Sequence, residues 1–259
     1  MAPQIVVMLH ALGASGRAWD EVIAALGGDY ACFAPDLPGF AEAVGMAETG
    51  IAATLDWLTE EIGRRAPAAY MLVGHSMGGK FATLLAVRAE AGEPRLAGLS
   101  GVVLLAASPP APEPMDEARR AAMIGWFADG APDEADARRF VEDNIAGPLA
   151  PARFGRAVAD VRRSAPAAWK GWLERGSRED WRDRAGRLSS PATIVAGADD
   201  GDLGEANQRR LNLPHYARAK VVVLPGAAHL LPYEQPDAVA RLIEEAARAH
   251  PDRGRGTCG

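Results

Sequence analysis

Short apolar segments alternate with longer amphipathic segments along most of the chain, and this alternation restricts the fold more than any other feature of the sequence. The apolar segments predict buried strands at residues 5–9, 30–34, 70–73, 101–106, 193–196 and 220–224. The segments between them place apolar residues three and four positions apart, which is typical of helices that pack on one face. We therefore expect an α/β fold with a mostly parallel six-stranded sheet flanked by helices.

The alternation stops after residue 108. Proline cannot donate to a sheet ladder or continue a helix interior, so a cluster of four marks an exit from the sheet: Pro109, Pro110, Pro112 and Pro114. The residues that follow have helical periodicity, with breaks near Gly130, Gly147 and Pro166, and predict no strand. We expect residues 109–187 to form a helical cap, inserted between two parts of one α/β core at residues 1–108 and 188–259.

Composition excludes several classes of protein. The net charge of −6 gives no indication of nucleic-acid or membrane binding. The two cysteines, Cys32 and Cys258, do not suggest a disulfide framework. The N-terminus lacks the features of a signal peptide, and no segment approaches the roughly 18 apolar residues that span a bilayer. We expect a cytoplasmic protein that ends in a frayed tail at residues 250–259; no feature indicates an oligomeric state.

The segment Gly74-His75-Ser76-Met77-Gly78 matches the pattern Gly-x-Ser-x-Gly between a predicted strand and a helix predicted at residues 77–91. In this context the motif is typical of a nucleophile elbow. The serine sits on a sharp, strained turn that needs small neighbours, and the turn lifts the hydroxyl to the carboxyl end of the sheet. The start of the helix favours negative charge that develops there. We interpret Ser76 as a catalytic nucleophile.

With three further segments, the elbow resembles the α/β-hydrolase superfamily over nearly all of the chain. These segments resemble the family's oxyanion loop, the turn after the next strand and the catalytic histidine loop: His10-Ala11-Leu12-Gly13-Ala14-Ser15, Asp36-Leu37-Pro38-Gly39 and Gly226-Ala227-Ala228-His229. The chain starts almost directly at the strand before the oxyanion loop. The resemblance therefore implies an α/β-hydrolase fold that lacks the family's first two strands and carries a helical cap.

The chain has five histidines, and chain order favours one of them as the base. In this family the base follows the acid and lies on a loop at the carboxyl end of a strand. His229 meets both conditions. A structural role is expected for His10, a position in the pocket lining for His75, and a surface position for His215 and His250.

The triad acid is expected after the strand predicted at residues 193–196. The family pattern Gly-x-x-Asp selects Asp200, while Asp199 and Asp202 remain alternatives. Some relatives place the acid after the preceding strand, but no carboxylate stands near residues 107–108. Asp200 is therefore the expected acid.

The resemblance implies a role for each of these residues. Ser76 attacks a carbonyl, His229 removes and returns the proton, and Asp200 fixes the histidine tautomer. The backbone N–H groups of Leu12 and Met77 are implied to hold the oxyanion.

Two positions depart from the family pattern. Ala11 stands where the family usually has glycine, and Gly39-Phe40-Ala41 replaces the usual Gly-His-Gly. If position 11 needs a positive φ, alanine is strained there and the oxyanion hole is shaped differently.

Four of the six tryptophans fall in the expected cap: Trp126, Trp169, Trp172 and Trp181. Most of them are expected to pack the cap onto the sheet, and Trp126, Trp169 and Trp172 are the candidates for an apolar substrate pocket. The arginine pairs of the cap are expected mainly on solvated faces, with contact to an anionic substrate or a phosphopantetheine carrier as the alternative. No metal-ligand cluster and no dinucleotide or phosphate loop occurs, so no cofactor is expected.

The leading hypothesis is hydrolysis of a small-molecule carboxylic ester, thioester or lactone through an acyl-enzyme on Ser76. One alternative keeps the triad but changes the reaction to C–C bond hydrolysis or a lyase or synthase step, since a fold does not fix the chemistry. A second alternative is a non-catalytic ligand-binding protein that retains the fold.

Overall fold

A computed structural model describes residues 4–46, 49–65 and 68–249 of the chain. His250, Cys258 and the tail expected at residues 250–259 lie outside the described residues. No described helix has both the length and the apolar composition that a membrane crossing requires.

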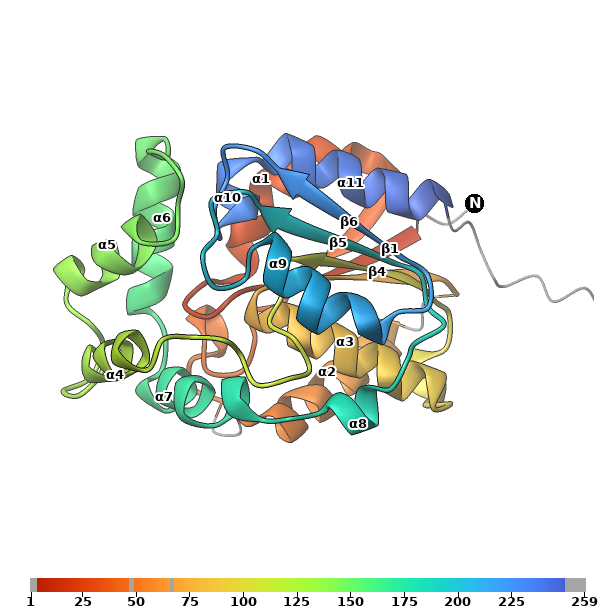
Figure 1. Cartoon of the computed structure of the whole chain (residues 1–259), viewed down its shortest axis with the longest axis horizontal. Coiled ribbons are helices and arrows are strands. Elements are labelled where there is room, and N and C mark those ends of the chain that lie inside the picture. The colour runs from red at the N-terminus through yellow and green to blue at the C-terminus, as the bar shows by residue number, and fades with distance from the viewer. Residues whose placement is uncertain (1–3, 47–48, 66–67, 250–259) are drawn as a thin grey trace, which may run out of the picture.

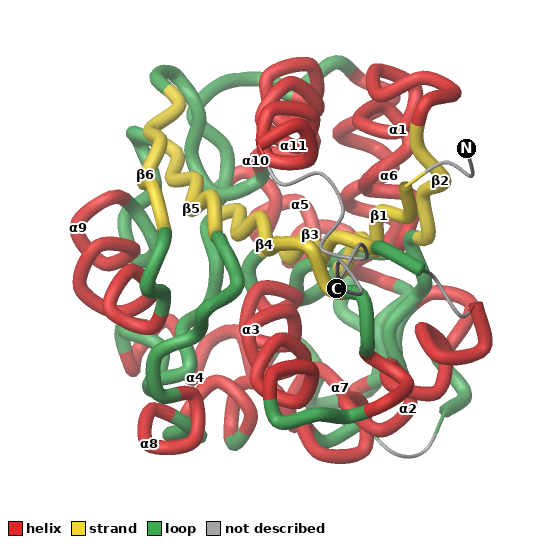
Figure 2. Tube along the Cα trace, turned by 90° about the vertical axis from the view of Figure 1, so that its right-hand side faces the viewer, coloured by secondary structure: helices red, strands yellow, loops and turns green. Residues whose placement is uncertain are grey.

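The described chain builds one six-stranded sheet with every pair of neighbouring strands parallel. The strands are β1 (Gln4–Leu9), β2 (Tyr30–Phe33), β3 (Tyr70–His75), β4 (Leu99–Leu105), β5 (Ala192–Gly197) and β6 (Ala219–Leu224). Their order across the sheet is β2-β1-β3-β4-β5-β6, as Figure 2 shows. The predicted six-stranded α/β sheet is thus confirmed, and its described part is parallel throughout.

Helices cover both faces of this sheet, because alternate side chains of each strand point to opposite sides. Val6 and Met8 of β1 pack in one apolar cluster with helices α1 (Asp20–Leu26) and α11 (Pro236–Ala249). Val7 and Leu9 pack in the other. That second cluster includes α2 (Ile51–Arg65) and α3 (Met77–Glu90), which lie on the opposite face of the sheet in Figure 1.

Two short elements follow the last strands. Helix α9 (Glu205–Asn207) continues into a π-helical turn, Gln208–Asn212, after β5. Helix α10 (Leu231–Glu234) lies after β6 and leads directly into α11. Both β5 and β6 therefore end in loops at the same edge of the sheet, where parallel strands bring their carboxyl ends together.

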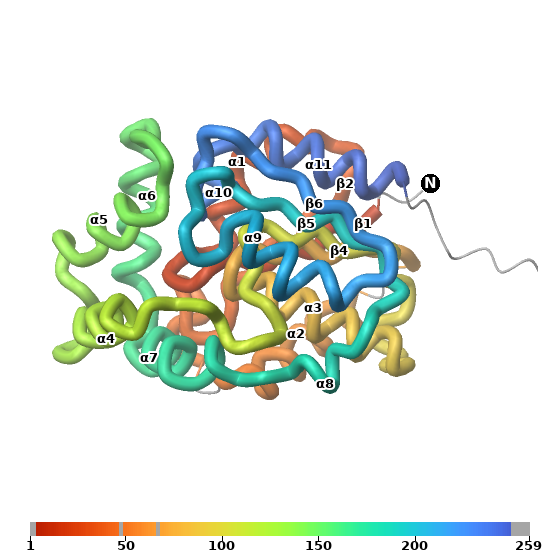
Figure 3. Tube along the Cα trace, in the orientation of Figure 1, coloured from red at the N-terminus to blue at the C-terminus, as the bar shows by residue number. Residues whose placement is uncertain are grey.

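Residues 109–187, which we call the helical insert, lie between β4 and β5 and contain five α-helices within the described chain. These are α4 (Glu117–Gly125), α5 (Glu134–Glu142), α6 (Pro151–Arg162), α7 (Pro166–Glu174) and α8 (Arg182–Ala185). Helices α4 to α7 gather at one end of the molecule (Figure 3), while α8 contacts α3. The insert adds no strand to the sheet; its Ser164 forms an isolated bridge with Phe40.

Local sequence explains where the insert helices begin. Asp116 and Asp133 cap α4 and α5, since their carboxylates accept hydrogen bonds from the N–H groups of Arg119 and Asp136 at 2.9 and 2.8 Å. Helices α6 and α7 both start with proline, whose fixed φ suits a first helical turn. The breaks expected near Gly130 and Gly147 fall between helices.

Candidate active site

Ser76 occupies the sharp turn between β3 and α3, with φ 50° and ψ −118°. A non-glycine residue at positive φ is strained, and such strain at a turn of this kind exposes a nucleophile. The flanking positions require glycine because a side chain would not fit there. A Cβ atom on Gly74 would lie 2.4 Å from the Gly78 carbonyl oxygen, and one on Gly78 would lie 2.2 Å from that of Leu9. The local sequence therefore permits a turn that few other residues would allow.

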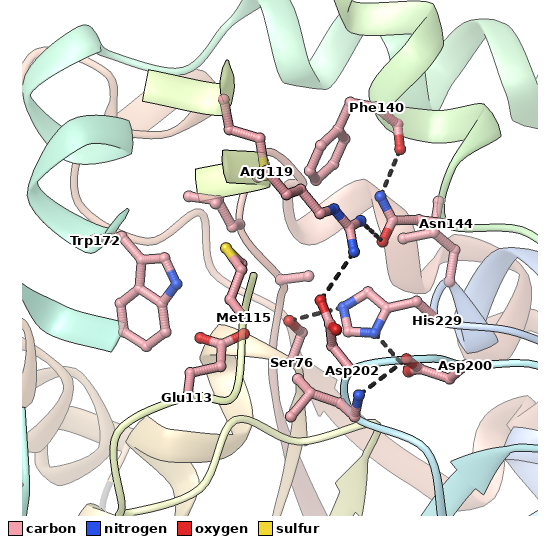
Figure 4. A pocket seen from close by; sticks show the side chains of 15 residues that line it. Ser76, Glu113, Met115, Arg119, Phe140, Asn144, Trp172, Asp200, Asp202 and His229 are labelled. Atoms are coloured by element: carbon pink, nitrogen blue, oxygen red, sulfur yellow. Dashed lines mark hydrogen bonds and ion pairs between the residues drawn. The ribbon is translucent and has the colours of Figure 1, made fainter. Parts of the chain in front are cut away.

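The structure brings Ser76 together with His229 and Asp200, from the loops after β6 and β5 (Figure 4). His229 Nδ1 lies 2.8 Å from Asp200 Oδ2, and His229 Nε2 lies 2.9 Å from Ser76 Oγ. An ionised carboxylate can only accept a hydrogen bond, so Nδ1 donates to Asp200. Nε2 is then free to accept from the Ser76 hydroxyl, which is the arrangement that a general base needs.

The three aspartates after β5 occupy different positions. Asp200 is almost fully buried and also accepts a hydrogen bond from the Leu203 N–H at 3.0 Å. Asp199 is exposed. Asp202 forms an ion pair with Arg119 Nη1 at 2.9 Å. Of the three carboxylates, it is Asp200 that the structure brings to His229.

The pKa values of His229 and Asp200 shift in opposite directions. Burial by itself would lower the pKa of His229, but the charge of Asp200 and its hydrogen bond outweigh burial and raise it. Burial would likewise raise the pKa of Asp200, but the positive charge and hydrogen bond of His229 hold it below its usual value. The pair thus stabilises the imidazolium form that arises when His229 accepts a proton.

The backbone N–H groups of Leu12 and Met77 are the predicted oxyanion donors. Met77 is the first residue of α3, so its N–H has no acceptor within the helix. Neither N–H donates to another group among the residues that the structure describes. Leu12 also lines the cavity beside Ser76.

The two departures from the family pattern differ in backbone conformation. Ala11 is not among the described non-glycine residues with positive φ, so alanine fits there without strain. Ala41 adopts φ 45°, the conformation that the usual glycine would tolerate more easily. The strain therefore lies at position 41 rather than at position 11.

His10 and His215 are held by backbone groups. The buried His10 Nδ1 donates to the Ala11 carbonyl oxygen at 2.8 Å, and its Nε2 accepts from the Leu37 N–H at 2.9 Å. Burial lowers the pKa of His10 to about 4, so the ring is neutral at pH 7. His215 is half-buried, with Nδ1 donating to the Gly186 carbonyl oxygen at 2.9 Å.

A cavity opens above Ser76 between the sheet loops and the insert, with about 500 Å³ of empty space including the part open to solvent. Most of its wall is apolar: Ala11, Leu12, Met115, Met123, Phe140, Trp172, Leu203 and Leu230. Besides Ser76, Asp200 and His229, its polar lining residues are Glu113, Arg119, Asn144 and Asp202. Within the described chain, no group of three His, Cys, Asp or Glu side chains is arranged to hold a metal ion.

Among the four side chains predicted to bind substrate, Trp172 lines this cavity, whereas His75, Trp126 and Trp169 are not among its lining residues. His75 donates from Nε2 to the His229 carbonyl oxygen at 2.7 Å. Trp169 is fully buried, stacks on Phe127 and donates to the Met123 carbonyl oxygen. Trp126 packs its ring edge-on against Phe140. Both tryptophans thus pack against aromatic side chains of the insert.

No motif in the sequence singled out Asn144, which joins the insert to the loop that carries His229. Its carbonyl oxygen accepts the N–H groups of both His229 and Leu230 at 3.1 Å. Its side-chain oxygen accepts from Arg119 Nη2 at 3.1 Å, and Arg119 in turn pairs with Asp202. One network thus connects α4, the end of α5 and the loops that carry Asp200 and His229 (Figure 4). These residues are far apart in sequence, so only their three-dimensional arrangement reveals the network.

Comparisons with known proteins show the family of the chain. The alpha/beta hydrolase family model matches residues 6–242. A pimeloyl-[acyl-carrier protein] methyl ester esterase of Neisseria meningitidis is 27% identical over 246 residues, covering 93% of this chain and 91% of the relative. The protein of the same name from Nitrosomonas europaea is 25% identical over 233 residues, covering 86% and 88%.

Solved structures share the fold. An esterase from Exiguobacterium antarcticum superimposes with a TM-score of 0.83 at 17% identity, covering 95% of this chain and 92% of that one. The enol-lactonase from Burkholderia xenovorans gives a TM-score of 0.79 at 20% identity, covering 96% and 92%.

Proposed function

Because the chain belongs to the alpha/beta hydrolase family, we propose that it is a serine hydrolase that cleaves carboxylic esters of small molecules through an acyl-enzyme on Ser76. The observation that carries this proposal is the continuous hydrogen-bonded chain from Ser76 through His229 to Asp200, with separations of 2.9 and 2.8 Å. A serine activated by a histidine that a buried carboxylate orients is the recurring arrangement of acyl-transfer enzymes.

Each step follows from these contacts. Ser76 Oγ attacks the ester carbonyl carbon while its proton moves to His229 Nε2. The negative oxygen of the tetrahedral intermediate accepts hydrogen bonds from the Leu12 and Met77 N–H groups, each typically worth about 10²–10³ in rate. When the tetrahedral intermediate collapses, it expels the alcohol, which takes the proton from His229. His229 then accepts a proton from a water molecule, which attacks the carbonyl carbon of the acyl-enzyme and releases the carboxylic acid.

Asp200 supports both half-reactions without changing its own protonation. Its hydrogen bond to Nδ1 keeps the tautomer in which Nε2 is the acceptor, and its charge stabilises the imidazolium. The opposite pKa shifts of Asp200 and His229 agree with these roles.

We assign residues 109–187 the role of a cap over a hydrolase core formed by residues 1–108 and 188–259. The insert supplies Glu113, Met115, Phe140 and Trp172 to the cavity wall, whereas the core supplies the triad. A wall of this kind suits a small acyl group better than a peptide chain.

The relatives' names suggest the class of ester. Both are named as methyl ester esterases of an acyl group carried on a protein. By analogy, the ester that this chain cleaves has a small alcohol as its leaving group and an apolar acyl chain that occupies the cavity. In the more specific form of this proposal, the acyl group is attached to a carrier protein. Thioesters and lactones belong to the same acyl-transfer chemistry.

Steady-state and burst kinetics on p-nitrophenyl esters of increasing chain length test the proposal. We expect a burst of p-nitrophenol equal to the enzyme concentration wherever deacylation is slow, with turnover that depends on chain length. Ser76→Ala should abolish both the burst and the turnover. Asp199→Asn, which changes an exposed side chain outside the triad, is the control and should retain both. A folded wild-type protein that turns over no ester would contradict the proposal and direct attention to C–C cleavage or ligand binding.

A further inference from the structure

His75 is the last residue of β3 and directly precedes Ser76. Alternation along the strand places its side chain on the same face of the sheet as Met71 and Val73, the face that α1 and α11 cover. The side chain is buried, and the ring of Trp19 packs edge-on against it with the ring centroids 6.4 Å apart. The direction of the His75 ring is therefore set by the sheet and by its packing against Trp19.

The ring of His75 makes one hydrogen bond among the described residues, and it does so as a donor. Nε2 lies 2.7 Å from the carbonyl oxygen of His229, which can only accept, so the ring proton is on Nε2. Nδ1 is buried without a hydrogen-bond partner in the described part of the chain. Burial lowers the pKa of His75 to about 3, so the ring is neutral at pH 7. His75 therefore acts on His229 as an uncharged donor and not as a second acid or base.

Three groups bind the backbone of His229, and they come from different parts of the molecule. The His229 N–H donates to the Asn144 carbonyl oxygen of the insert at 3.1 Å. The His229 carbonyl oxygen accepts from the Leu231 N–H at 3.0 Å and from His75 Nε2 at 2.7 Å. Leu231 follows two residues later in the same loop, so its bond shapes the turn but does not fix the loop to the sheet. Of the three partners, His75 is the one that belongs to β3, the strand that leads into Ser76.

We infer that His75 is a positioning residue, whose Nε2–H group holds the carbonyl group of His229 so that the imidazole meets both the nucleophile and the acid. This inference rests on the serine hydrolase function proposed above. Because His75 and Ser76 are adjacent in the chain, the end of one strand fixes the nucleophile and, through one hydrogen bond, the backbone of the base. The 2.9 Å separation of Ser76 Oγ and His229 Nε2 depends on that link. A displacement of about 1 Å between reacting groups can cost roughly 10²-fold in rate.

Two amide variants test whether a donor at the position of Nε2 is required, with steady-state kinetics on a p-nitrophenyl ester. The amide nitrogen of glutamine is as many bonds from Cα as His75 Nε2, whereas that of asparagine corresponds to Nδ1. His75→Asn should therefore lower kcat by roughly 10²-fold, His75→Gln should stay within about tenfold of the wild type, and KM should change little in both. His215→Asn, at a half-buried histidine outside the cavity, is the matched control and should keep the wild-type kcat. Equal kcat values in the two His75 variants would overturn the inference.

A third variant covers the case in which His75→Asn does not fold because the smaller side chain leaves a cavity. His75→Phe keeps a ring against Trp19 but carries no donor, so its kcat should fall to the same extent as expected for His75→Asn. Circular dichroism and thermal unfolding check that each variant is folded at the assay temperature. A folded His75→Phe protein with the wild-type kcat would overturn the inference.

Titration of the His229 ring separates this inference from the proposed reaction, because it needs no turnover. The variants leave unchanged the charged groups that act on the pKa of His229: Asp200, Glu113 and Arg119. In His75→Phe the released loop should carry His229 away from Asp200, so the pKa of His229 should fall toward the ordinary value of about 6.5. NMR spectroscopy of protein isotopically labelled in histidine measures this pKa, and His75→Gln should keep the wild-type value. An unchanged pKa of His229 in His75→Phe would overturn the inference, whether or not the wild type hydrolyses an ester.

Discussion

The sheet core and the helical insert bury their residues in different ways. Strands β3, β4 and β5 are covered on both faces, and nearly all of their side chains are buried. The insert helices bury one face only, around Trp169 and Phe127, while their outer faces carry charged side chains such as the Arg138–Glu134 pair. The buried apolar residues of the insert, such as Phe127 and Trp169, belong to the same apolar cluster as Val7 and Leu72 of the sheet, so apolar packing is continuous between the two regions.

Polar contacts add to this apolar packing between the insert and the core. Lys80 of α3 is fully buried and donates to carbonyl oxygens near both ends of the insert, at Ala111, Gly176 and Glu179. Asn144 connects the insert to His229. The loops at the strand ends thus carry Ser76, Asp200 and His229, while the insert forms much of the cavity wall and holds the backbone of His229. Changes in the two regions should therefore have different consequences.

The largest effect is expected at the core loops. Ser76→Ala and His229→Ala should each lower kcat by about 10⁴-fold or more, because the nucleophile and base act as one unit. Steady-state kinetics with a saturating ester measures this, and unchanged circular dichroism excludes misfolding. Activity within tenfold of the wild type in either variant would break the assignment of the chemistry to the core.

The next largest effect distinguishes the three aspartates after β5. Asp200→Asn should lower kcat by about 10³–10⁴-fold, because the amide no longer fixes the histidine tautomer. Asp199→Asn should have no effect, since that side chain is exposed. Asp202→Asn should reduce kcat far less than Asp200→Asn. A larger loss in either neighbour than in Asp200→Asn would move the acid to that position.

A smaller effect is expected where the insert supports the base. Asn144→Ala removes the side chain that ties this residue to Arg119 and Phe140, so the carbonyl group that binds the His229 N–H should lose its fixed position. We expect kcat to fall by about tenfold with little change in KM. Arg138→Ala, on the outer face of the insert, is the control. Wild-type kcat in Asn144→Ala would mean that the insert does not position the base.

The pH dependence of kcat/KM tests whether charged residues of the insert influence His229. His229 accepts a proton only when neutral, so kcat/KM should rise with pH through an apparent pKa above the ordinary histidine value of about 6.5. The Arg119 cation lowers the pKa of His229 and the Glu113 charge raises it. Arg119→Ala should therefore move the profile to higher pH, whereas Glu113→Gln should move it to lower pH. Profiles that coincide with the wild type would show that the insert does not tune the base.

The smallest effect compares two buried alanines of the core. Ala11 has an ordinary backbone, whereas Ala41 adopts φ 45° where its N–H binds the Arg163 carbonyl oxygen of the insert. Ala→Gly costs backbone entropy at both sites, but only at Ala41 does it also relieve strain. Ala11→Gly should therefore lower the free energy of unfolding by about 1 kcal/mol more than Ala41→Gly, measured by denaturant unfolding. An equal decrease in the free energy of unfolding for both variants would show that Ala41 is not strained.

Much of the core could be predicted because its signals are local. The strand at Tyr70–His75, the glycines around Ser76 and the helix after it lie within one continuous segment, so the motif and its geometry coincide. The positions of the aromatic side chains in the insert were harder to predict. Trp169 and Trp172 lie on one helix, yet one is sealed against Phe127 and the other reaches the cavity. The packing of α7 determines which does so, and periodicity does not encode that rotation.

The sequence by itself determined the α/β architecture, the position of the insert and the identity of Ser76 and His229 as candidates, because periodicity and motif spacing act over a few residues. Tertiary structure alone decided that Asp200 rather than its neighbours faces His229, that Asn144 binds the backbone of the loop that carries His229 and that Glu113 lines the cavity. These choices depend on side-chain direction and loop closure between segments distant in sequence. They are set by packing and hydrogen-bond satisfaction across the whole molecule.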